Sequence, residues 1–215
     1  MNGVPISDLT GLILAGGRAE RMGGRDKGLL LLHGQPLVSY AIRLLRPQVG
    51  ELLISANRHL AEYQAFGWPV VSDSIGEFYG PLAGMLAALE IAAKPHVLSV
   101  PCDSPLLPAD YARRMGTALL DALAEISVAW DGRRLQPVFA LLRTELRDSL
   151  RDYLAAGERK IDRWFAQHRL AQADFADTPE LFRNINTPEE LAAMERDMPP
   201  NPIATGPLPP AHPHD

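Results

Sequence analysis

Residues 10–15 read Thr-Gly-Leu-Ile-Leu-Ala, and the two residues that follow are Gly16 and Gly17. The first six residues form a short and almost uninterrupted apolar run, which is typical of a strand buried on both faces of a parallel sheet. The two glycines end this run and open a loop at its carboxyl end. Residues 10–15 are therefore predicted to be a first central strand of an α/β fold.

Helical and extended patterns alternate after this strand. Pro36 is suited to the first turn of a helix, and apolar residues then recur at helical spacing as far as Leu45. Further strands are predicted at 52–56, 69–72 and 96–101, and further helices at 59–66 and 81–93, the second of them amphipathic. This alternation indicates an open, mostly parallel sheet with helices on both faces. In such sheets, ligands bind outside the carboxyl ends of the strands.

The alternation weakens in the second half of the chain. The elements predicted there are a helix at 108–123, a strand pair at 126–130 and 137–142, helical stretches at 145–156 and 159–168, a strand at 182–186 and a last helix that opens at Thr187-Pro188. We expect residues 1–195 to form one domain and the proline-rich residues 196–215 to be a disordered tail.

Composition restricts the class of protein. The net charge of −5 over 215 residues excludes a surface that binds nucleic acid or anionic membrane as a whole, so an anionic ligand must meet a local cationic patch. Cys102 is the single cysteine, which excludes an internal disulfide and favours the cytoplasm. The apolar stretch at 12–15 has no basic residue before it and is too short for a signal peptide or a membrane span.

The loop after the first strand combines glycines with positive charge. Residues 14–28 read L-A-G-G-R-A-E-R-M-G-G-R-D-K-G, and its cations are Arg18, Arg21, Arg25 and Lys27. Glycines allow the backbone to approach a phosphate, and the cations offset its charge. The spacing matches neither the P-loop nor the dinucleotide pattern G-x-G-x-x-G. The alternative is a solvated flexible loop, which the mutual repulsion of four cations disfavours.

Two carboxylates follow predicted strands. Asp103 stands at the end of the strand at 96–101, where it can hold Mg²⁺, an ion that takes one or two carboxylates together with phosphate oxygens and water. A cap for the helix that follows is the alternative role for Asp103. Asp73 follows the third strand and is a nucleotide contact, a group that orients metal-bound water, or a turn residue. Lys27 is the cation that we expect on the phosphates, with Arg21 and Arg25 as second choices.

The loop L-A-G-G-x-x-x-R-M-G-G-x-D-K-G resembles the signature of the molybdenum cofactor guanylyltransferase family, within the nucleotidyltransferase superfamily. Later motifs of that family are similar in the same order, at 56–59, 80–85, 101–105 and 184–191. The resemblance covers about residues 10–193 and is weakest between 123 and 136. It implies a three-layer, Rossmann-like nucleotidyltransferase fold. It also implies transfer of GMP from GTP to the terminal phosphate of Mo-molybdopterin, with Mg²⁺ as the cofactor.

The resemblance also implies roles for individual residues. The GTP contacts that it implies are Leu14, Ala15, Gly16, Gly17, Lys27, Asn57, Asp73, Gly80, Pro81, Leu82 and Asp103. Lys27, Asp103 and Arg21 are the expected catalytic residues, and Asp103 is the expected metal ligand. The acceptor side is assigned to Gln136, Asn184 and Asn186, with Arg159 and Lys160 as weaker candidates.

Asn184 and Asn186 are two residues apart on a predicted strand, so their amides are expected on one face, where they can read the edges of a pterin. The alternative is that these amides bond to the turn before the helix cap at Thr187.

Four competing functions remain open. Related enzymes that use CTP on molybdenum cofactor, or act on sugar phosphates, typically carry L-A-A-G where residues 14–17 read L-A-G-G, so Gly17 argues against both. A non-catalytic GTP-binding cofactor carrier would bind without releasing pyrophosphate. A GTP hydrolase would release inorganic phosphate but lacks the P-loop lysine-serine pair. The resemblance further suggests transient contacts to the molybdenum-inserting protein and to molybdoenzyme chaperones, and we expect a monomer.

Overall fold

The structure is a computed structural model, and it describes residues 3–15, 26–73 and 80–198. The strands are β1 (Leu9–Leu14), β2 (Leu31–Leu32), β3 (Gln35–Pro36), β4 (Glu51–Ser55), β5 (Val70–Val71), β6 (His96–Pro101), β7 (Ile126–Trp130), β8 (Leu135–Arg143) and β9 (Leu170–Asp174). The α-helices are α1 (Leu37–Leu45), α2 (Leu60–Gln64), α3 (Pro81–Ile91), α4 (Tyr111–Asp121), α5 (Arg147–Ala155), α6 (Ile161–Phe165) and α7 (Pro188–Asp197). Short 3-10 helices are η1 (Ile6–Asp8), η3 (Lys27–Leu29), η4 (Arg46–Gln48), η5 (Thr144–Leu146) and η6 (Pro179–Phe182).

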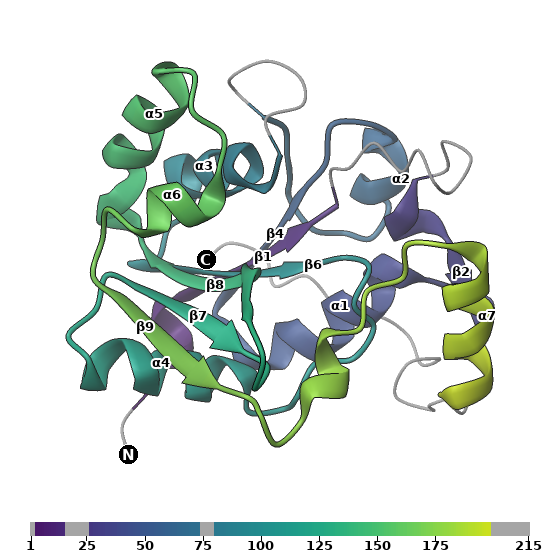
Figure 1. Cartoon of the computed structure of the whole chain (residues 1–215). Coiled ribbons are helices and arrows are strands. Elements are labelled where there is room, and N and C mark those ends of the chain that lie inside the picture. The colour runs from purple at the N-terminus through teal and green to yellow at the C-terminus, as the bar shows by residue number, and fades with distance from the viewer. Residues whose placement is uncertain (1–2, 16–25, 74–79, 199–215) are drawn as a thin grey trace.

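A seven-stranded sheet runs through the molecule in the order β5-β4-β1-β6-β8-β7-β9 (Figure 1). β1 is parallel to both β4 and β6, β4 is parallel to β5, and β7 is parallel to β9. β8 runs antiparallel to both of its neighbours, β6 and β7. The prediction of an open, mostly parallel sheet is confirmed, and β1 is an interior strand with a parallel neighbour on each side, as expected of residues 10–15.

Helices cover the sheet on both faces, which gives three layers. Figure 1 shows α3, α5 and α6 on one side of the sheet and α1 and α4 on the other. β1 contributes side chains to the apolar clusters on both faces of the sheet, because alternate residues of a strand point to opposite faces. Leu9 and Ile13 pack with α1 and α4, whereas Leu12 and Leu14 pack with α3 and α5. All six residues of β1 are buried, as expected for a strand covered on both faces.

α3 is not the amphipathic helix that was predicted for residues 81–93. Every residue from 82 to 89 is buried, because α3 packs against the sheet and also against α5. Gly84 allows the close approach to the sheet: a Cβ atom at this position would lie 2.6 Å from Cδ2 of Leu14 and 2.5 Å from Oγ of Ser55. The helix therefore has no long polar face to present to solvent.

The second half of the chain contains the other differences. The strand predicted at 182–186 is wrong: Phe182 ends η6, and residues 183–186 pair with no strand in the described part of the chain. β9 was not predicted at all, because its sequence Leu-Ala-Gln-Ala-Asp buries only alanines between polar residues. The strand pair at 126–130 and 137–142 is confirmed as β7 and β8, and the helix at Thr187-Pro188 is confirmed as α7.

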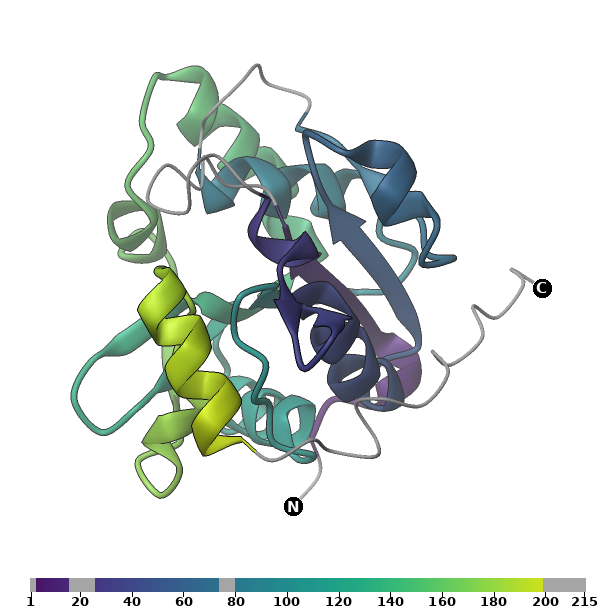
Figure 2. The same ribbon diagram turned by 90° about the vertical axis from the view of Figure 1, so that its right-hand side faces the viewer.

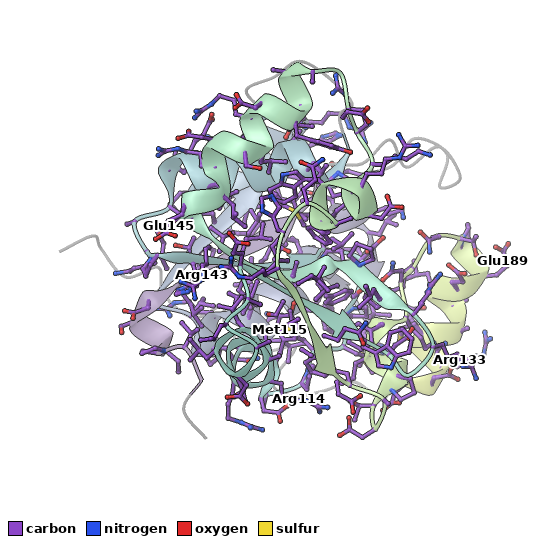
Figure 3. All side chains as sticks on the ribbon, turned by 60° about the vertical axis from the view of Figure 1, so that its left-hand side comes forward. Arg114, Met115, Arg133, Arg143, Glu145 and Glu189 are labelled. Atoms are coloured by element: carbon purple, nitrogen blue, oxygen red, sulfur yellow. The ribbon has the colours of Figure 1, made fainter. Side chains whose placement is uncertain are left out.

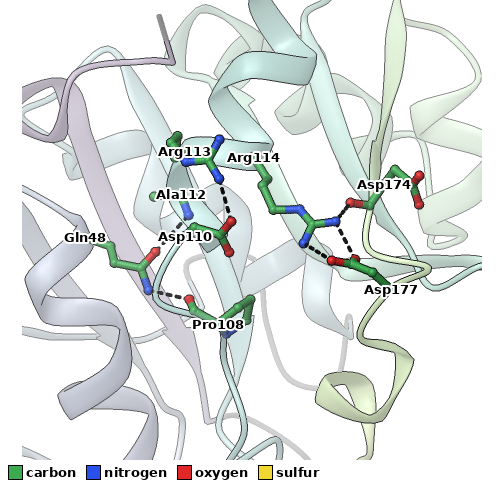
Figure 4. Close-up of polar contacts among 8 residues, drawn as sticks. All are labelled: Gln48, Pro108, Asp110, Ala112, Arg113, Arg114, Asp174 and Asp177. Carbon is green, nitrogen blue, oxygen red and sulfur yellow. Dashed lines mark hydrogen bonds and ion pairs between the residues drawn. The ribbon is translucent and has the colours of Figure 1, made fainter. Parts of the chain in front are cut away.

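Side-chain hydrogen bonds and an ion pair connect α4 to a neighbouring segment on each side (Figure 4). The buried Gln48 accepts a hydrogen bond from the backbone N–H of Ala112 at 2.9 Å and donates to the carbonyl of Pro108 at 2.9 Å. Arg114 lies over the ring of Phe175 at 4.1 Å and forms an ion pair with Asp177 at 2.7 Å. α4 is thereby joined to η4 on one side and to the segment after β9 on the other.

α7 lies at one end of the molecule, beside the small β2–β3 sheet (Figure 1), and faces the viewer in Figure 2. A third apolar cluster joins these elements, formed by Leu30, Leu32, Leu37, Tyr40, Ile185 and Met194. Within the described ranges, none of the helices combines the length and the apolar character that a membrane span requires.

Candidate active site

The carboxyl ends of β1, β4 and β6 meet at one edge of the sheet. Leu14 is in register with both Ser55 and Pro101. The pairing continues one residue further, because the N–H of Ala15 donates to Ser55 O at 2.8 Å and the N–H of Cys102 donates to Leu14 O at 3.0 Å. The candidate residues that follow these strands are thereby brought together at one edge, as the sequence predicted.

Lys27 and Asp103 form an ion pair at this edge. The Nζ atom of Lys27 lies 3.0 Å from Oδ2 of Asp103 and donates a second hydrogen bond to Oδ1 of Asn186 at 2.6 Å. The side chains of Lys27 and Asp103 are 23% and 13% exposed, so the pair is partly shielded but open to a ligand. The structure therefore brings together two of the three residues expected to be catalytic and one that was assigned to the acceptor.

The segment 184–186 docks on the residues after β6 without forming a strand. The hydroxyl of Ser104 donates to Oδ1 of Asn184 at 2.5 Å, and the N–H of Ile185 donates to the carbonyl of Asp103 at 2.9 Å. Thr187 caps α7 through a capping box with Glu190. The amide oxygens of Asn184 and Asn186 therefore bond to Ser104 and Lys27.

Asn57 and Asp73 bind each other directly. Asn57 donates from Nδ2 to Oδ2 of Asp73 at 2.8 Å, and its Oδ1 accepts from the N–H of Asp73 at 2.9 Å. Burial raises the pKa of the Asp73 carboxyl, and the hydrogen bond from Asn57 acts in the opposite direction. These bonds fix the chain after β5 to the chain after β4, so the two residues form one polar unit beside β1.

Gln136 lies at the same sheet edge because β8 is antiparallel. β8 begins at this edge and ends at Arg143 on the opposite one, as the labels of Arg133 and Arg143 on opposite sides of Figure 3 show. The buried Gln136 donates to Oδ2 of Asp131 at 2.6 Å. Asp131 also accepts from the N–H groups of Arg133 and Arg134, both at 2.8 Å, so Gln136 is tied to the β7–β8 turn.

The remaining candidates lie around these groups or outside the described residues. Gly80, with φ of 70°, precedes α3, and Pro81 and Leu82 form its first turn. Arg159 donates to the carbonyl of Leu154 at 2.8 Å, and Lys160 is exposed in the same α5–α6 connection. Residues whose positions fall outside the described ranges are Gly16, Gly17, Arg18, Arg21 and Arg25.

Two residues near Lys27 were not identified from the sequence. Asp26 is buried, and its Oδ1 accepts hydrogen bonds from the Gly28 N–H at 3.1 Å and from the Tyr63 hydroxyl at 2.5 Å. The position of Asp26 inside the D-K-G triplet was a signal for it, whereas Tyr63 lies in a short helix with nothing in its neighbours to mark it. Burial raises the pKa of the Cys102 thiol, which fits its expected role as a small buried residue.

The donor set at Asp103 is suited to Mg²⁺ rather than to a metal held by protein alone. The described residues contain no group of three or more His, Cys, Asp and Glu side chains that would hold an ion. Mg²⁺ is commonly held by one or two carboxylates together with phosphate oxygens and water. Asp103 supplies one such carboxylate, whose Oδ2 accepts from Lys27.

Comparisons with known proteins agree with this architecture. A family model described as the MobA-like NTP transferase domain matches residues 11–173. A molybdenum cofactor guanylyltransferase from Shewanella sediminis is 52% identical over 83% of this chain and 91% of its own length. One from Cupriavidus taiwanensis is 52% identical over 87% of this chain and 96% of its own.

Solved structures show the same fold at lower identity. The molybdopterin-guanine dinucleotide biosynthesis protein A from Archaeoglobus fulgidus superposes with a TM-score of 0.72 at 20% identity, over 87% of this chain and 97% of that one. A CMP:2-keto-3-deoxy-manno-octonic acid synthetase in complex with CTP superposes with a TM-score of 0.68 at 14% identity, over 89% and 98%. The three-layer fold is therefore shared with these solved structures.

Proposed function

Because this chain belongs to the family of MobA-like NTP transferases that includes the molybdenum cofactor guanylyltransferases, we propose that it transfers GMP from GTP to the terminal phosphate of Mo-molybdopterin. The reaction releases pyrophosphate and leaves the molybdopterin guanine dinucleotide cofactor. The observation that carries the assignment of the site is the pair of Lys27 Nζ and Asp103 Oδ2, 3.0 Å apart at the edge where the parallel strands end.

The chemistry is a direct displacement at phosphorus. An oxygen of the acceptor phosphate forms a bond to the α-phosphorus of GTP, while the bond from that phosphorus to the bridging oxygen breaks and pyrophosphate leaves with the electron pair. The attacking phosphate is already ionised at neutral pH, so no general base is required. Catalysis then depends on aligning the two substrates and on stabilising the charge that develops between them.

Lys27 is the residue that we place on the phosphates of GTP. Its ammonium group offsets negative charge on the departing pyrophosphate, and this effect is strongest when the charge is already in place before the reaction. The bonds to Asp103 and Asn186 hold the ammonium at the sheet edge. We keep Arg21 as a second cation for the phosphates.

Asp103 is the residue that would hold Mg²⁺. When bound, the ion supplies positive charge beside the phosphate oxygens. The carboxylate of Asp103 is fixed in place because its backbone carbonyl accepts from Ile185 and its side chain accepts from Lys27.

The two substrates are assigned to neighbouring parts of the edge. The nucleoside of GTP is placed against the ends of β1 and β4 and the start of α3, at Leu14, Ala15, Gly16, Gly17, Asn57, Asp73, Gly80, Pro81 and Leu82. The acceptor is placed on the other side of Asp103, at Gln136, Asn184 and Asn186. Segment 184–186 docks on Asp103 and Ser104, which puts the amides of Asn184 and Asn186 beside the proposed metal ligand. This contact supports an acceptor site on that side of Asp103.

A nucleotide panel tests the proposal. The purified protein is incubated with Mg²⁺, molybdenum-loaded molybdopterin and either GTP, CTP, ATP or UTP, and both pyrophosphate and the dinucleotide product are measured. Preference for GTP with equal yields of both products is the expected result. Preference for CTP would indicate a cytidylyltransferase, GTP binding without pyrophosphate would indicate a carrier, and steady release of inorganic phosphate would indicate a hydrolase.

We also propose that the protein works in the cytoplasm as a monomer. The buried thiol of Cys102 supports a reducing compartment. Contacts with the molybdenum-inserting protein and with molybdoenzyme chaperones are proposed to be transient, so they should appear only while the cofactor is transferred.

A further inference from the structure

The backbone at Lys27 is fixed by the buried carboxylate that precedes it. Asp26 is 7% exposed, and its Oδ1 accepts a hydrogen bond from the N–H of Gly28 at 3.1 Å. The Asp26 side chain thereby caps η3, the 3-10 helix that begins with Lys27. This cap sets the direction in which the Lys27 side chain leaves the backbone toward Asp103.

Tyr63 makes the second contact to the same oxygen. Its hydroxyl donates to Oδ1 of Asp26 at 2.5 Å, and its side chain is completely buried in α2, 37 residues further along the chain. A buried carboxylate that loses a donor is left with an unsatisfied charge, which is costly. Burial raises the pKa of Tyr63, with Cys102 and Asp26 adding to the effect, so the hydroxyl keeps its proton and stays a donor throughout the neutral range.

Gly28 leaves no free space in this arrangement. A Cβ atom at Gly28 would lie 2.4 Å from the Tyr63 hydroxyl oxygen and 3.3 Å from Sγ of Cys102. The backbone beside Lys27 is therefore packed directly on the tyrosine hydroxyl. A displacement of either Tyr63 or Asp26 must move the backbone that carries Lys27.

From these contacts we propose that Tyr63 is a positioning residue for the transfer reaction: acting through Asp26, it fixes the backbone of Lys27 and so the place of the ammonium group at the triphosphate. The inference rests on the proposed function, because that function puts Lys27 on the phosphates of GTP. It assigns Tyr63 no contact with either substrate. The effect is expected to be large because misplacing a catalytic group by about 1 Å can lower turnover by about 100-fold.

Tyr63→Phe tests this role because it removes the hydroxyl and keeps the ring. We expect kcat to fall by about ten-fold or more while KM for GTP changes much less. Tyr111→Phe is the matched control: Tyr111 is equally buried, and its hydroxyl donates to the backbone carbonyl of Ser99 at 2.9 Å. The control should lose a similar amount of thermal stability and keep the wild-type kcat.

Two further comparisons separate positioning from packing. Asp26→Asn keeps an oxygen acceptor for Gly28 and Tyr63 and should retain most of the turnover, whereas Asp26→Ala should lose as much as Tyr63→Phe. Asp26→Ala also serves as the test if Tyr63→Phe does not fold. In a Lys27→Ala background, Tyr63→Phe should leave the residual kcat unchanged, because no ammonium group remains to be misplaced.

The inference is overturned if both Tyr63→Phe and Asp26→Ala keep the wild-type kcat. It is also overturned if Tyr63→Phe lowers kcat by the same factor with and without Lys27, since the hydroxyl would then act through packing alone. A wild-type protein that releases no pyrophosphate from GTP overturns the proposed function and this inference together. The first two results leave the proposed function intact.

Discussion

The Nζ atom of Lys27 lies 2.6 Å from Oδ1 of Asn186, although 159 residues separate the two in sequence. The same ammonium group binds Asp103, which follows the central strand β6. A residue from the start of the chain, one from its middle and one from near its end therefore meet at a single nitrogen atom. This convergence places the proposed cation for GTP directly beside the proposed acceptor segment.

Lys27→Ala should remove most of the activity and little of the stability. We expect kcat to fall by about 100- to 1,000-fold, because a charge aimed at the reacting phosphates is lost. The unfolding free energy should change by less than about 2 kcal/mol, since the ion pair is partly exposed. Pyrophosphate release and urea unfolding measure the two effects. Lys27→Arg is the control that keeps the charge, and wild-type turnover in Lys27→Ala would exclude the lysine from the reaction.

Asp103→Asn should abolish the response to Mg²⁺. The substitution keeps the size and a hydrogen-bond acceptor for Lys27 but removes the negative charge that a hard cation requires. Turnover should fall by about 100-fold or more, and saturation should require far more Mg²⁺. A titration of pyrophosphate release against Mg²⁺ concentration gives the readout. Near-normal Mg²⁺-dependent transfer by this variant would remove the metal assignment.

Asn184→Ala should weaken binding of the acceptor and leave GTP binding unchanged. We expect KM for molybdenum-loaded molybdopterin to rise by about ten-fold, which corresponds to the loss of one good hydrogen bond, about 1.4 kcal/mol. Ser104→Ala is the matched control, because it breaks the same bond inside the protein while the amide remains. An equal rise of KM in both variants would mean that Asn184 acts only by holding its segment in place.

The protein should become less stable at acidic pH because the folded state disfavours protonation of His96. Burial lowers the pKa of His96 below its usual 6.5, with Arg143 acting in the same direction and Asp8 against it. The folded state then binds fewer protons than the unfolded state, so this contribution is complete above pH 6.5 and is lost as pH falls through the folded pKa. Urea unfolding of wild type and His96→Gln between pH 8 and pH 5 should show a smaller acid loss in the variant. Parallel curves would contradict this assignment.

The nucleotide half of the site could be read from the sequence because its parts are local. A buried strand, the residue that follows it and the direction of a parallel sheet are enough to bring Leu14, Asn57, Asp73 and Asp103 to one edge. Lys27 follows from the same logic, since its loop begins at the end of β1. These predictions depend on patterns within about ten residues of each other.

The acceptor half could not be read in the same way. The extended residues 183–186 lie against Asp103 and Ser104 instead of pairing with a strand, and an alternating sequence does not distinguish these two environments. β9 alternates only alanine with polar residues, so its apolar signal is weak. Tyr63 contacts the carboxylate of Asp26, 37 residues away, and no local sequence pattern predicts such a contact.

The reversed direction of β8 has a consequence for how this protein can evolve. Parallel strands are joined by crossover connections that usually contain a helix, so the strands of the nucleotide side are tied to the helices that connect them. β7 and β8 are joined instead by a turn of four residues, 131–134, at the sheet edge, and such turns tolerate substitution and insertion more readily than helices do. Natural selection can therefore remodel this turn to suit another acceptor while the half that we assign to GTP is inherited unaltered.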